Sequence, residues 1–299
     1  MAPLLEVDNL KIDARKDDGS LTPIVKGVSF NVKPGEVVAL IGESGSGKTT
    51  IALSALGYTK PGLEFTSGEV RLNGQDVISM PSEEKRLMRG QKVAYLAQSA
   101  AATFNPAMTI GEQVTESAII HGQLLKEDAD NRAEELYRAL ELPEPERLGK
   151  RYPHQVSGGQ LQRLMAAMAL CGNPDLLVLD EPTTALDVTT QIEVLKAFKS
   201  VIKQEGSAAI YVTHDLSVVA QIADEIVVLY AGEVQEHGSA EQVVSTPNHD
   251  YTRRLMNAVR PPPAAGQGDN IKKSDIEVPV LELKNIFAGY GKIRDGSPN

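Results

Sequence analysis

Three short apolar runs, each followed by small or polar residues, constrain the fold of this 299-residue chain more than any other feature. They cover residues 37–41, 176–179 and 209–212. Uninterrupted aliphatic runs of this length are typical of strands that are buried on both faces of a parallel sheet. Ligands of open α/β sheets bind beyond the carboxyl ends of the strands. We therefore expect the residues that follow the three runs to meet at one site.

The first run ends in GESGSGKTT, which fits the G-x-x-x-x-G-K-[ST] pattern of a phosphate-binding loop between a strand and a helix. Its glycines let backbone N–H groups turn toward phosphates, and a helix N-terminus favours anions. Lys48 would reach the β- and γ-phosphates of a nucleotide, and the Thr49 hydroxyl could ligate Mg²⁺. A Gly/Ser-rich turn without a ligand is the alternative. The candidate nucleotide-binding residues are Gly42, Glu43, Ser44, Gly45, Ser46, Gly47, Lys48, Thr49 and Thr50.

The second run continues into Asp180 and Glu181, and the third into Thr213 and His214. Asp180 stands where a carboxylate could contact Mg²⁺ directly or through water. Glu181 stands where a carboxylate could orient an attacking water molecule. A solvated acidic turn is the alternative interpretation of this pair.

The segment VSGGQLQRLMAAMAL at residues 156–170 predicts a helix. Ser157 and Gln160 form a capping box, an apolar stripe follows, and a Gly and a Pro come directly after the segment. The cap does not require Gly158 and Gly159, but they would bare the backbone so that a phosphate could approach the helix N-terminus. The pattern therefore predicts a second anion site.

Composition narrows the class of protein. The net charge of −10 disfavours an extended nucleic-acid interface, so we expect no nucleic-acid partner. Cys171 is the single cysteine, which excludes an internal disulfide and a cysteine-rich metal site. The N-terminus lacks the features of a secretory signal, and no uncharged apolar run approaches the ~18 residues of a membrane span. We expect a soluble, cytoplasmic protein.

Together these motifs resemble the nucleotide-binding subunit of ABC transporters. The resemblance implies an α/β fold: a P-loop NTPase with a RecA-like, mainly parallel core, an N-terminal antiparallel β part and an inserted α-helical subdomain. One mild departure is Val156, where the family's signature normally opens with Leu. The matching elements are Walker A at 42–49, Gln98, the VSGGQ signature at 156–160, Walker B at 176–181, TALD at 184–187 and His214.

The resemblance also implies ATP and Mg²⁺ as cofactors and a head-to-tail pair of domains, with ATP between the phosphate loop of one and the signature of the other. Gln98 would contact Mg²⁺ or the water and sense the membrane partner, while His214 would hold the γ-phosphate. Asp187 would link the two sites. A polar loop residue, a histidine at a strand end and a helix cap are the respective alternatives. The implied catalytic residues are Glu181 as general base, His214, Gln98 and Lys48; the metal ligands are Thr49, Gln98 and Asp180; the signature residues acting in trans are Ser157, Gly158, Gly159 and Gln160.

Further segments are similar to the oligopeptide, dipeptide and nickel importers, most specifically PNHDYTRRLMNAV at 247–259. They imply ATP hydrolysis that drives import of peptides or similar small solutes through transmembrane permease subunits, fed by a solute-binding protein. The chain would then lie at the inner face of the cell membrane. Ser99 and Ala100 replace the subfamily's usual Asp-Pro. An accessory ATPase of phosphonate breakdown and a non-transport soluble ABC ATPase are the alternatives.

The domain organisation predicted from these segments has four parts. PVLELKNIFAGY, from Pro279, repeats the pattern of PLLEVDNLKIDA, from Pro3, which predicts the start of a second, truncated ABC domain. A stray amphipathic strand is the alternative. The partner domain would be the missing second half or a second copy of the chain. The predicted parts are an ABC ATPase domain at 1–238 with a helical insert at about 101–170, an extension at 239–262, a linker at 263–278 and the repeat at 279–299.

The same repeat locates the expected adenine contact. It places Tyr290 at the position where the family stacks an aromatic ring on adenine, and Ala14 at the equivalent position of the first domain. Because Ala14 has no ring, we expect the phosphates to dominate binding and the base to be discriminated weakly. The alternatives are that Ile12 or Phe30 covers the base, or that the loop is shifted by one residue.

Overall fold

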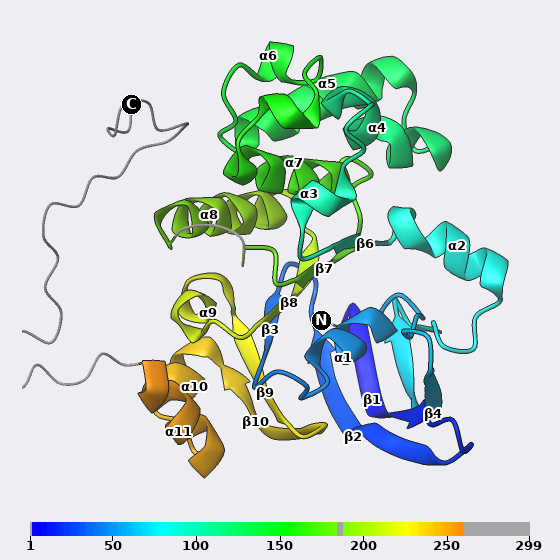
Figure 1. Ribbon diagram of the computed structural model, residues 1–299, viewed down its shortest axis with the longest axis vertical. Coiled ribbons are helices and arrows are strands. Elements are labelled where there is room, and N and C mark those ends of the chain that lie inside the picture. The colour runs from blue at the N-terminus through cyan, green and yellow to red at the C-terminus, as the bar shows by residue number, and fades with distance from the viewer. Residues whose placement is uncertain (1, 184–187, 260–299) are drawn as a thin grey trace, which may run out of the picture. The chain divides into compact units, whose positions relative to one another are not determined.

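The computed structural model describes residues 2–183 and 188–259, which belong to one compact unit (Figure 1). Asp187 and the rest of TALD lie outside the described residues. The same holds for the last residues of the extension, the linker at 263–278 and the repeat at 279–299, including Tyr290. The four-part domain organisation therefore stays a prediction.

A six-stranded sheet in the order β10-β9-β3-β8-β7-β6 forms the centre of the molecule (Figure 1). Neighbouring strands from β9 to β6 run parallel, and β10 pairs antiparallel with β9. The three apolar runs are β3, β8 and β7, which lie side by side with every residue buried, so the predicted parallel sheet is confirmed. The strands are β3 (Val37–Ile41), β6 (Val93–Leu96), β7 (Leu176–Asp180), β8 (Ala208–Thr213), β9 (Glu225–Tyr230) and β10 (Glu233–Ser239).

A second, antiparallel sheet in the order β2-β1-β4-β5 is built from the N-terminal part of the chain, as the resemblance implied. Its strands are β1 (Leu5–Arg15), β2 (Leu21–Val32), β4 (Leu63–Leu72) and β5 (Gln75–Asp76). Helix α1 (Lys48–Ser54) shares one apolar core with residues of both sheets, including Leu5 and Leu40. Burial of this shared core fixes the helix that begins at the phosphate loop against both sheets.

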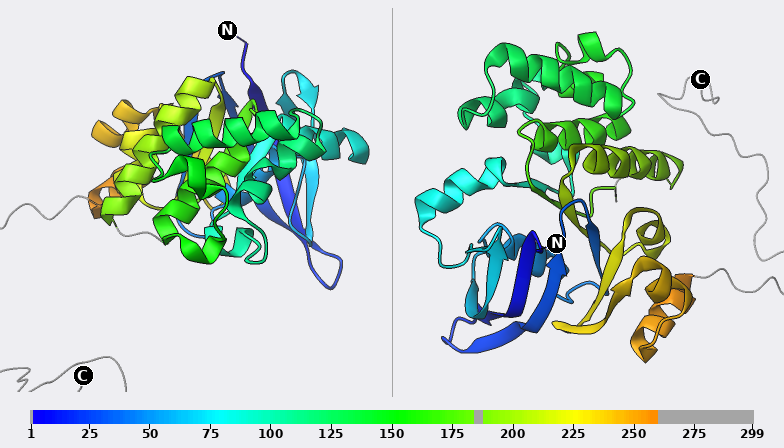
Figure 2. Two further views of the ribbon diagram at one scale, coloured as in Figure 1. Left: turned by 90° about the horizontal axis from the view of Figure 1, so that it is seen from above. Right: turned by 180° about the vertical axis from the view of Figure 1, so that it is seen from behind.

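Helices cover the opposite face of the parallel sheet (Figure 2). Along β7 and β8, side chains that point into the core shared with α1 alternate with side chains that point to the other face. Leu177, Leu179 and Tyr211 belong to the second group and pack among helices that follow β6 in the chain. These helices occupy the stretch where the insert was expected. They are α3 (Ala100–Thr103), α4 (Ile110–Ile120), α5 (Lys126–Ala139), α6 (Pro145–Leu148), the 3₁₀ turn η1 (Pro153–Gln155) and α7 (Gly158–Leu170), while α2 (Ser82–Gln91) precedes β6 and α8 (Val188–Glu205) follows β7.

Two helices of this part begin with a capping box. In α7, Gln160 N donates to Ser157 Oγ (3.3 Å) and Ser157 N donates to Gln160 Oε1 (3.0 Å), which confirms the predicted helix start. In α4, Thr109 and Glu112 make the same reciprocal pair. Each box satisfies backbone N–H groups that the first turn of a helix leaves without intrahelical partners.

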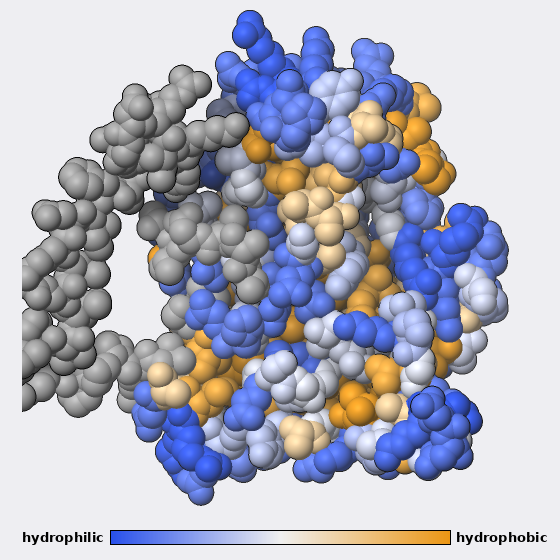
Figure 3. All heavy atoms as spheres, viewed as in Figure 1, coloured by the Kyte–Doolittle hydropathy of each residue, from blue (hydrophilic) through white to orange (hydrophobic). Residues whose placement is uncertain are grey.

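The last described segment closes a third core. Helices α9 (Leu216–Ile222), α10 (Ala240–Ser245) and α11 (Asp250–Val259) pack around Ala39 and Ile41 and the outward side chains of β9. On the face drawn in Figure 3, apolar side chains form separate patches among hydrophilic ones. Within residues 2–183 and 188–259, no helix has the length and apolar character needed to cross a membrane.

Replacing Thr109 with Ala removes one member of the α4 capping box. The expected cost is about 1 kcal/mol of unfolding free energy. For a unit of this size that corresponds to a fall in Tm of roughly 2–4 °C, measurable by thermal denaturation. Thr109→Ser keeps the hydroxyl and serves as the control. An unchanged Tm for Thr109→Ala would show that the box adds nothing to stability.

Candidate functional site

The ends of the three central strands meet at one cavity of about 580 Å³. The segment after β3 supplies most of its wall, β7 leads into Glu181, and β8 leads into His214. The cavity therefore forms where the parallel topology predicts a ligand site. Its lining residues are Ile24, Ser44, Gly45, Gly47, Lys48, Thr49, Thr50, Lys60, Glu181 and His214.

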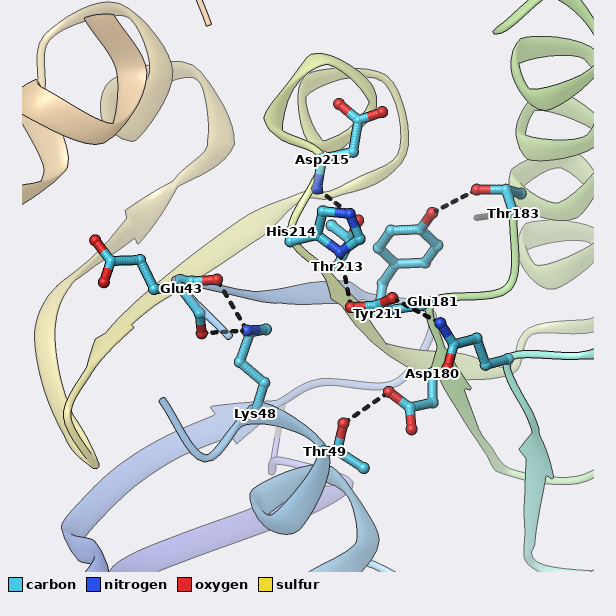
Figure 4. A network of polar contacts seen from close by, with 12 residues as sticks. Glu43, Lys48, Thr49, Asp180, Glu181, Thr183, Tyr211, Thr213, His214 and Asp215 are labelled. Atoms are coloured by element: carbon cyan, nitrogen blue, oxygen red, sulfur yellow. Dashed lines mark hydrogen bonds and ion pairs between the residues drawn. The ribbon is translucent and has the colours of Figure 1, made fainter. Parts of the chain in front are cut away.

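The loop after β3 depends on backbone conformations that favour glycine. Gly42 has a φ of 146°, and a Cβ at that position would lie 2.1 Å from the backbone oxygen of Leu229. Gly47 has a φ of 96° at the start of α1. Lys48 Nζ turns back into the loop and donates to Gly42 O and Glu43 O, at 2.8 Å each (Figure 4). The loop thus curls around the ammonium group of Lys48.

Two polar groups of this loop, the Lys48 ammonium and the Ser46 hydroxyl, can bind an anion. Lys48 is only 6% exposed, and this burial lowers the pKa of its ammonium, while Glu181, Asp180 and Glu43 oppose the shift. The Ser46 hydroxyl is buried without a hydrogen-bond partner among the described residues. An unpaired buried hydroxyl is costly, and a phosphate oxygen would accept a hydrogen bond from it. The loop therefore fits a phosphate group chemically.

Asp180 is held from two elements. Thr49 Oγ1 donates to Asp180 Oδ1 (2.9 Å) from α1 (Figure 4). Tyr95 Oη donates to Asp180 Oδ2 (3.1 Å) from β6. Burial, followed by the charge of Asp180, raises the pKa of Tyr95, so this hydroxyl stays a donor. Both carboxylate oxygens thus have fixed directions.

Glu181 is held in the same way. His214 Nδ1 lies 2.8 Å from Glu181 Oε1, and Gln98 Nε2 donates to Glu181 Oε2 at 3.1 Å. The backbone of Glu181 has a φ of 50°, which is unfavourable for a residue with a side chain, while its N–H donates to Val212 O. Strain of this kind persists where surrounding contacts over-determine a residue, often at functional sites. The structure thus brings together Gln98, Glu181 and His214, which are far apart in the sequence.

A second polar network flanks this group. Gln191 Nε2 donates to Thr183 Oγ1 (3.0 Å) and Asp215 Oδ2 (3.5 Å), and the Tyr211 hydroxyl lies 3.4 Å from Thr183 Oγ1. Burial raises the pKa of Tyr211 to about 12, so its hydroxyl is protonated near neutral pH. The network ties the residues after β7 to the residue that follows His214.

The signature lies apart from this cavity. Ser157 and Gly158 are exposed at the start of α7, and none of the cavity's lining residues comes from 157–160. Gly159 packs closely, since a Cβ there would lie 2.7 Å from Thr190 Cγ2. The expected intersite residue, Asp187, lies outside the described residues.

Sequence reasoning missed three residues of the site: Tyr95, Lys60 and Ile24. Tyr95 could have been suspected, because it stands three positions before Gln98 on the strand that leads to it. Lys60 and Ile24 carry no motif signal, since they reach the cavity from a turn after α1 and from β2.

The alternative adenine contacts, Ile12 and Phe30, were wrong. Ile12 is 0% exposed and Phe30 is 3% exposed, so both lie in the core rather than at the cavity. Ile12 pairs across the strands with Val25, whose Cγ2 lies 3.5 Å from where a Cβ on Gly47 would be. Ala14 is two residues beyond Ile12 on the same face of β1. That face points toward the phosphate loop.

A phosphate loop that meets two carboxylates at the carboxyl ends of parallel strands defines a P-loop nucleotide-hydrolysing protein. The family model described as ABC transporter matches residues 25–184. The chain belongs to the ABC transporter family, and it is an ATPase.

Known proteins agree with this assignment. The chain is 39% identical to the oligopeptide transport ATP-binding protein AppD of Bacillus subtilis (strain 168), over 94% of this chain and 85% of AppD. It is 40% identical to the peptidoglycan transport ATP-binding protein YejF of Agrobacterium fabrum, over 90% of this chain and 51% of YejF. The solved dimer of the ATP-binding cassette MJ0796, bound to ADP and Pi, superposes with a TM-score of 0.68 at 29% identity, covering 79% of this chain and 98% of that one.

Glu181→Gln keeps hydrogen-bonding atoms at this position but removes the basicity of the carboxylate. We expect ATP turnover to fall by about 10² or more, because general-base assistance is lost. Nucleotide affinity, measured by fluorescent-nucleotide titration, should be preserved. Lys48→Ala should instead weaken binding itself, because it deletes a cation from the loop. Wild-type turnover in Glu181→Gln would assign the base to another group.

Ala14→Tyr adds a ring to the face of β1 that points toward the phosphate loop. We expect the wild-type protein to discriminate weakly between ATP and GTP, and the variant to bind ATP about ten-fold more tightly through base stacking. Asp13→Tyr is the matched control, since neighbouring residues of a strand point to opposite faces. A strong preference for ATP in the wild type, with no gain in Ala14→Tyr, would place the base elsewhere.

Proposed function

We propose that this ATPase energises the import of peptides or similar small solutes through separate transmembrane permease subunits, from the inner face of the cell membrane. The support is its relationship to AppD, which is named as an oligopeptide transport ATP-binding protein and is similar over 94% of this chain. A binding protein would deliver the solute to the permease and would act on this chain only indirectly.

The catalytic part of the proposal rests on the two polar contacts that orient the Glu181 carboxylate. His214 and Gln98 each take one carboxylate oxygen, so the group is oriented at the cavity before any water arrives. In this proposal Glu181 accepts the proton of the water that attacks the γ-phosphate. Lys48 and the loop N–H groups bind the β- and γ-phosphates, and His214 contacts the γ-phosphate from the cavity wall.

The residues around Asp180 fit a magnesium ion. The Thr49 hydroxyl and the Asp180 carboxylate supply oxygen atoms, the ligand type that Mg²⁺ prefers. Gln98, whose amide nitrogen donates to Glu181, would add its amide oxygen. The ion would offset negative charge on the phosphates. Thr49 and Tyr95 hold the two oxygens of Asp180 in fixed directions, which keeps the carboxylate oriented for that role.

The position of the signature supports a head-to-tail pair. Ser157 and Gly158 are exposed and do not line the cavity that holds Lys48. In the proposed pair, residues 157–160 act on the nucleotide of the opposite domain, and Asp187 connects the two sites. MJ0796 is described as dimeric in its solved structure. The opposite domain is a second copy of this chain or another ABC domain, and no nucleic acid takes part.

Mixing two inactive variants tests the pair. Lys48→Ala disables a phosphate loop, and Ser157→Arg blocks a signature, so each variant alone should be inactive. A mixed pair contains one intact combination of loop and signature, so mixing should restore up to about a quarter of the wild-type rate. Turnover per chain should also rise with protein concentration. Concentration-independent turnover by a species that light scattering shows to be monomeric would contradict the pair.

Import is tested with the products of the genes that neighbour this one, which the proposal expects to include permease subunits. The proposal expects them to co-purify with the chain and, in proteoliposomes, to take up radiolabelled peptides when ATP is supplied on the side of this subunit. The same complex with Glu181→Gln should bind ATP and show no uptake. Neighbouring genes for lyase subunits, without permeases, would instead favour phosphonate breakdown.

A further inference from the structure

The segment PNHDYTRRLMNAV at 247–259 carries part of the sequence resemblance to peptide importers, yet the ATPase chemistry does not use it. It forms α11 and the turn before it, and α11 contacts α9 and β10, the strand that pairs with β9 (Figure 1). β9 pairs in parallel with β3, the strand that leads into the phosphate loop. The segment is therefore close enough to the loop to act on it.

A buried carboxylate anchors this segment. Glu236, on β10, is 9% exposed and accepts hydrogen bonds from Asn248 N (2.8 Å), His249 N (3.0 Å) and Gln242 Nε2 (2.9 Å). Burial alone would raise the pKa of Glu236, but these hydrogen bonds together lower it below its ordinary value. Bonds from N–H groups to an ionised carboxylate are stronger than neutral ones. The turn before α11 is thus fixed to the sheet.

The anchored turn places Tyr251 against the phosphate loop. Tyr251 is 7% exposed and packs in the core that contains Ile41, the last residue of β3. Its ring lies 4.6 Å from the ring of Tyr230 at the end of β9. Its hydroxyl oxygen accepts a hydrogen bond from Glu43 N at 3.4 Å. A helix of the C-terminal segment thus contacts the backbone of the second loop residue.

Tyr251 and the ammonium group of Lys48 contact the same peptide group of the loop. Glu43 receives the Tyr251 contact on its N–H, and the carbonyls of Gly42 and Glu43 both accept from Lys48 Nζ. Gly42 is confined on its other side by Leu229 O of β9. Because Gly42 O and Glu43 N belong to one planar peptide group, fixing the N–H also fixes the carbonyl that holds Lys48.

We infer that Tyr251 is a positioning residue of the phosphate loop: its hydroxyl orients the Gly42–Glu43 peptide and, through it, the ammonium of Lys48. The C-terminal extension is therefore part of the nucleotide site, and α11 sets how tightly the loop binds phosphate. This inference rests on the proposed nucleotide binding at the loop.

Tyr251→Phe tests the hydroxyl alone, in the full 299-residue chain. Loss of one neutral hydrogen bond predicts an increase of roughly 2- to 10-fold in the Kd for ATP and ADP and in the KM for ATP. The kcat should stay close to the wild-type value, because Glu181, Gln98 and His214 are untouched. Tyr230→Phe is the matched control, since it removes the neighbouring hydroxyl of the same ring pair and should leave Kd and KM unchanged.

A second variant separates positioning from packing. Tyr251→Leu should lower the Tm as well as the affinity, because it removes the ring from the core, whereas Tyr251→Phe should keep the Tm of the wild type. Equal Kd values for wild type, Tyr251→Phe and Tyr230→Phe would overturn the inference. If the wild type itself fails to bind nucleotide, the proposed function fails instead, so the two failures are distinguishable.

Discussion

The buried ammonium group of Lys48 is the constraint on which the rest of the site depends. A cation removed from water is costly unless hydrogen-bond acceptors and opposite charges surround it. Here Gly42 O and Glu43 O accept its protons, and the carboxylates of Asp180 and Glu181 lie on the neighbouring side. The loop can curl around the group only because Gly42 tolerates a conformation in which a Cβ would strike Leu229 O. Phosphate binding is therefore prepared by the backbone before any nucleotide arrives.

The order of strands in the parallel sheet places the catalytic side chains next to the Lys48 loop. Because β3, β8 and β7 are neighbours, their carboxyl ends bring Lys48, His214 and Glu181 to one cavity. The edge strand β6 and the segment after it then hold both carboxylates, since Tyr95 of β6 donates to Asp180 and Gln98, two residues beyond the strand, donates to Glu181. A displacement of the segment from Tyr95 to Gln98 would disturb both carboxylates together.

The remaining parts of the chain act on the cavity from a distance. The signature at the start of α7 is exposed and outside the cavity, and in the proposed pair it acts on the nucleotide of the opposite domain. The C-terminal helix α11 contacts the loop from behind through Tyr251, with Glu236 as its anchor. Within the chain, one site is thus assembled from a loop, an edge strand with the segment after it, and a C-terminal helix. Each contributes a small number of directed hydrogen bonds to groups whose positions the sheet has already set.

The sequence by itself determined the features whose physical cause is local. The apolar runs became β3, β7 and β8, and Ser157 and Gln160 capped α7, because burial on both faces of a strand and the capping box are encoded within a few residues. Only the tertiary structure decided the rest. Tyr95 meets Asp180 and Tyr251 meets Glu43 across 85 and 208 positions of chain. The register between β1 and β2 shifts after Ile12, and packing, rather than residue type, puts Ile12 in the core and Ile24 on the cavity wall. Such contacts depend on how whole elements pack, which no local pattern records.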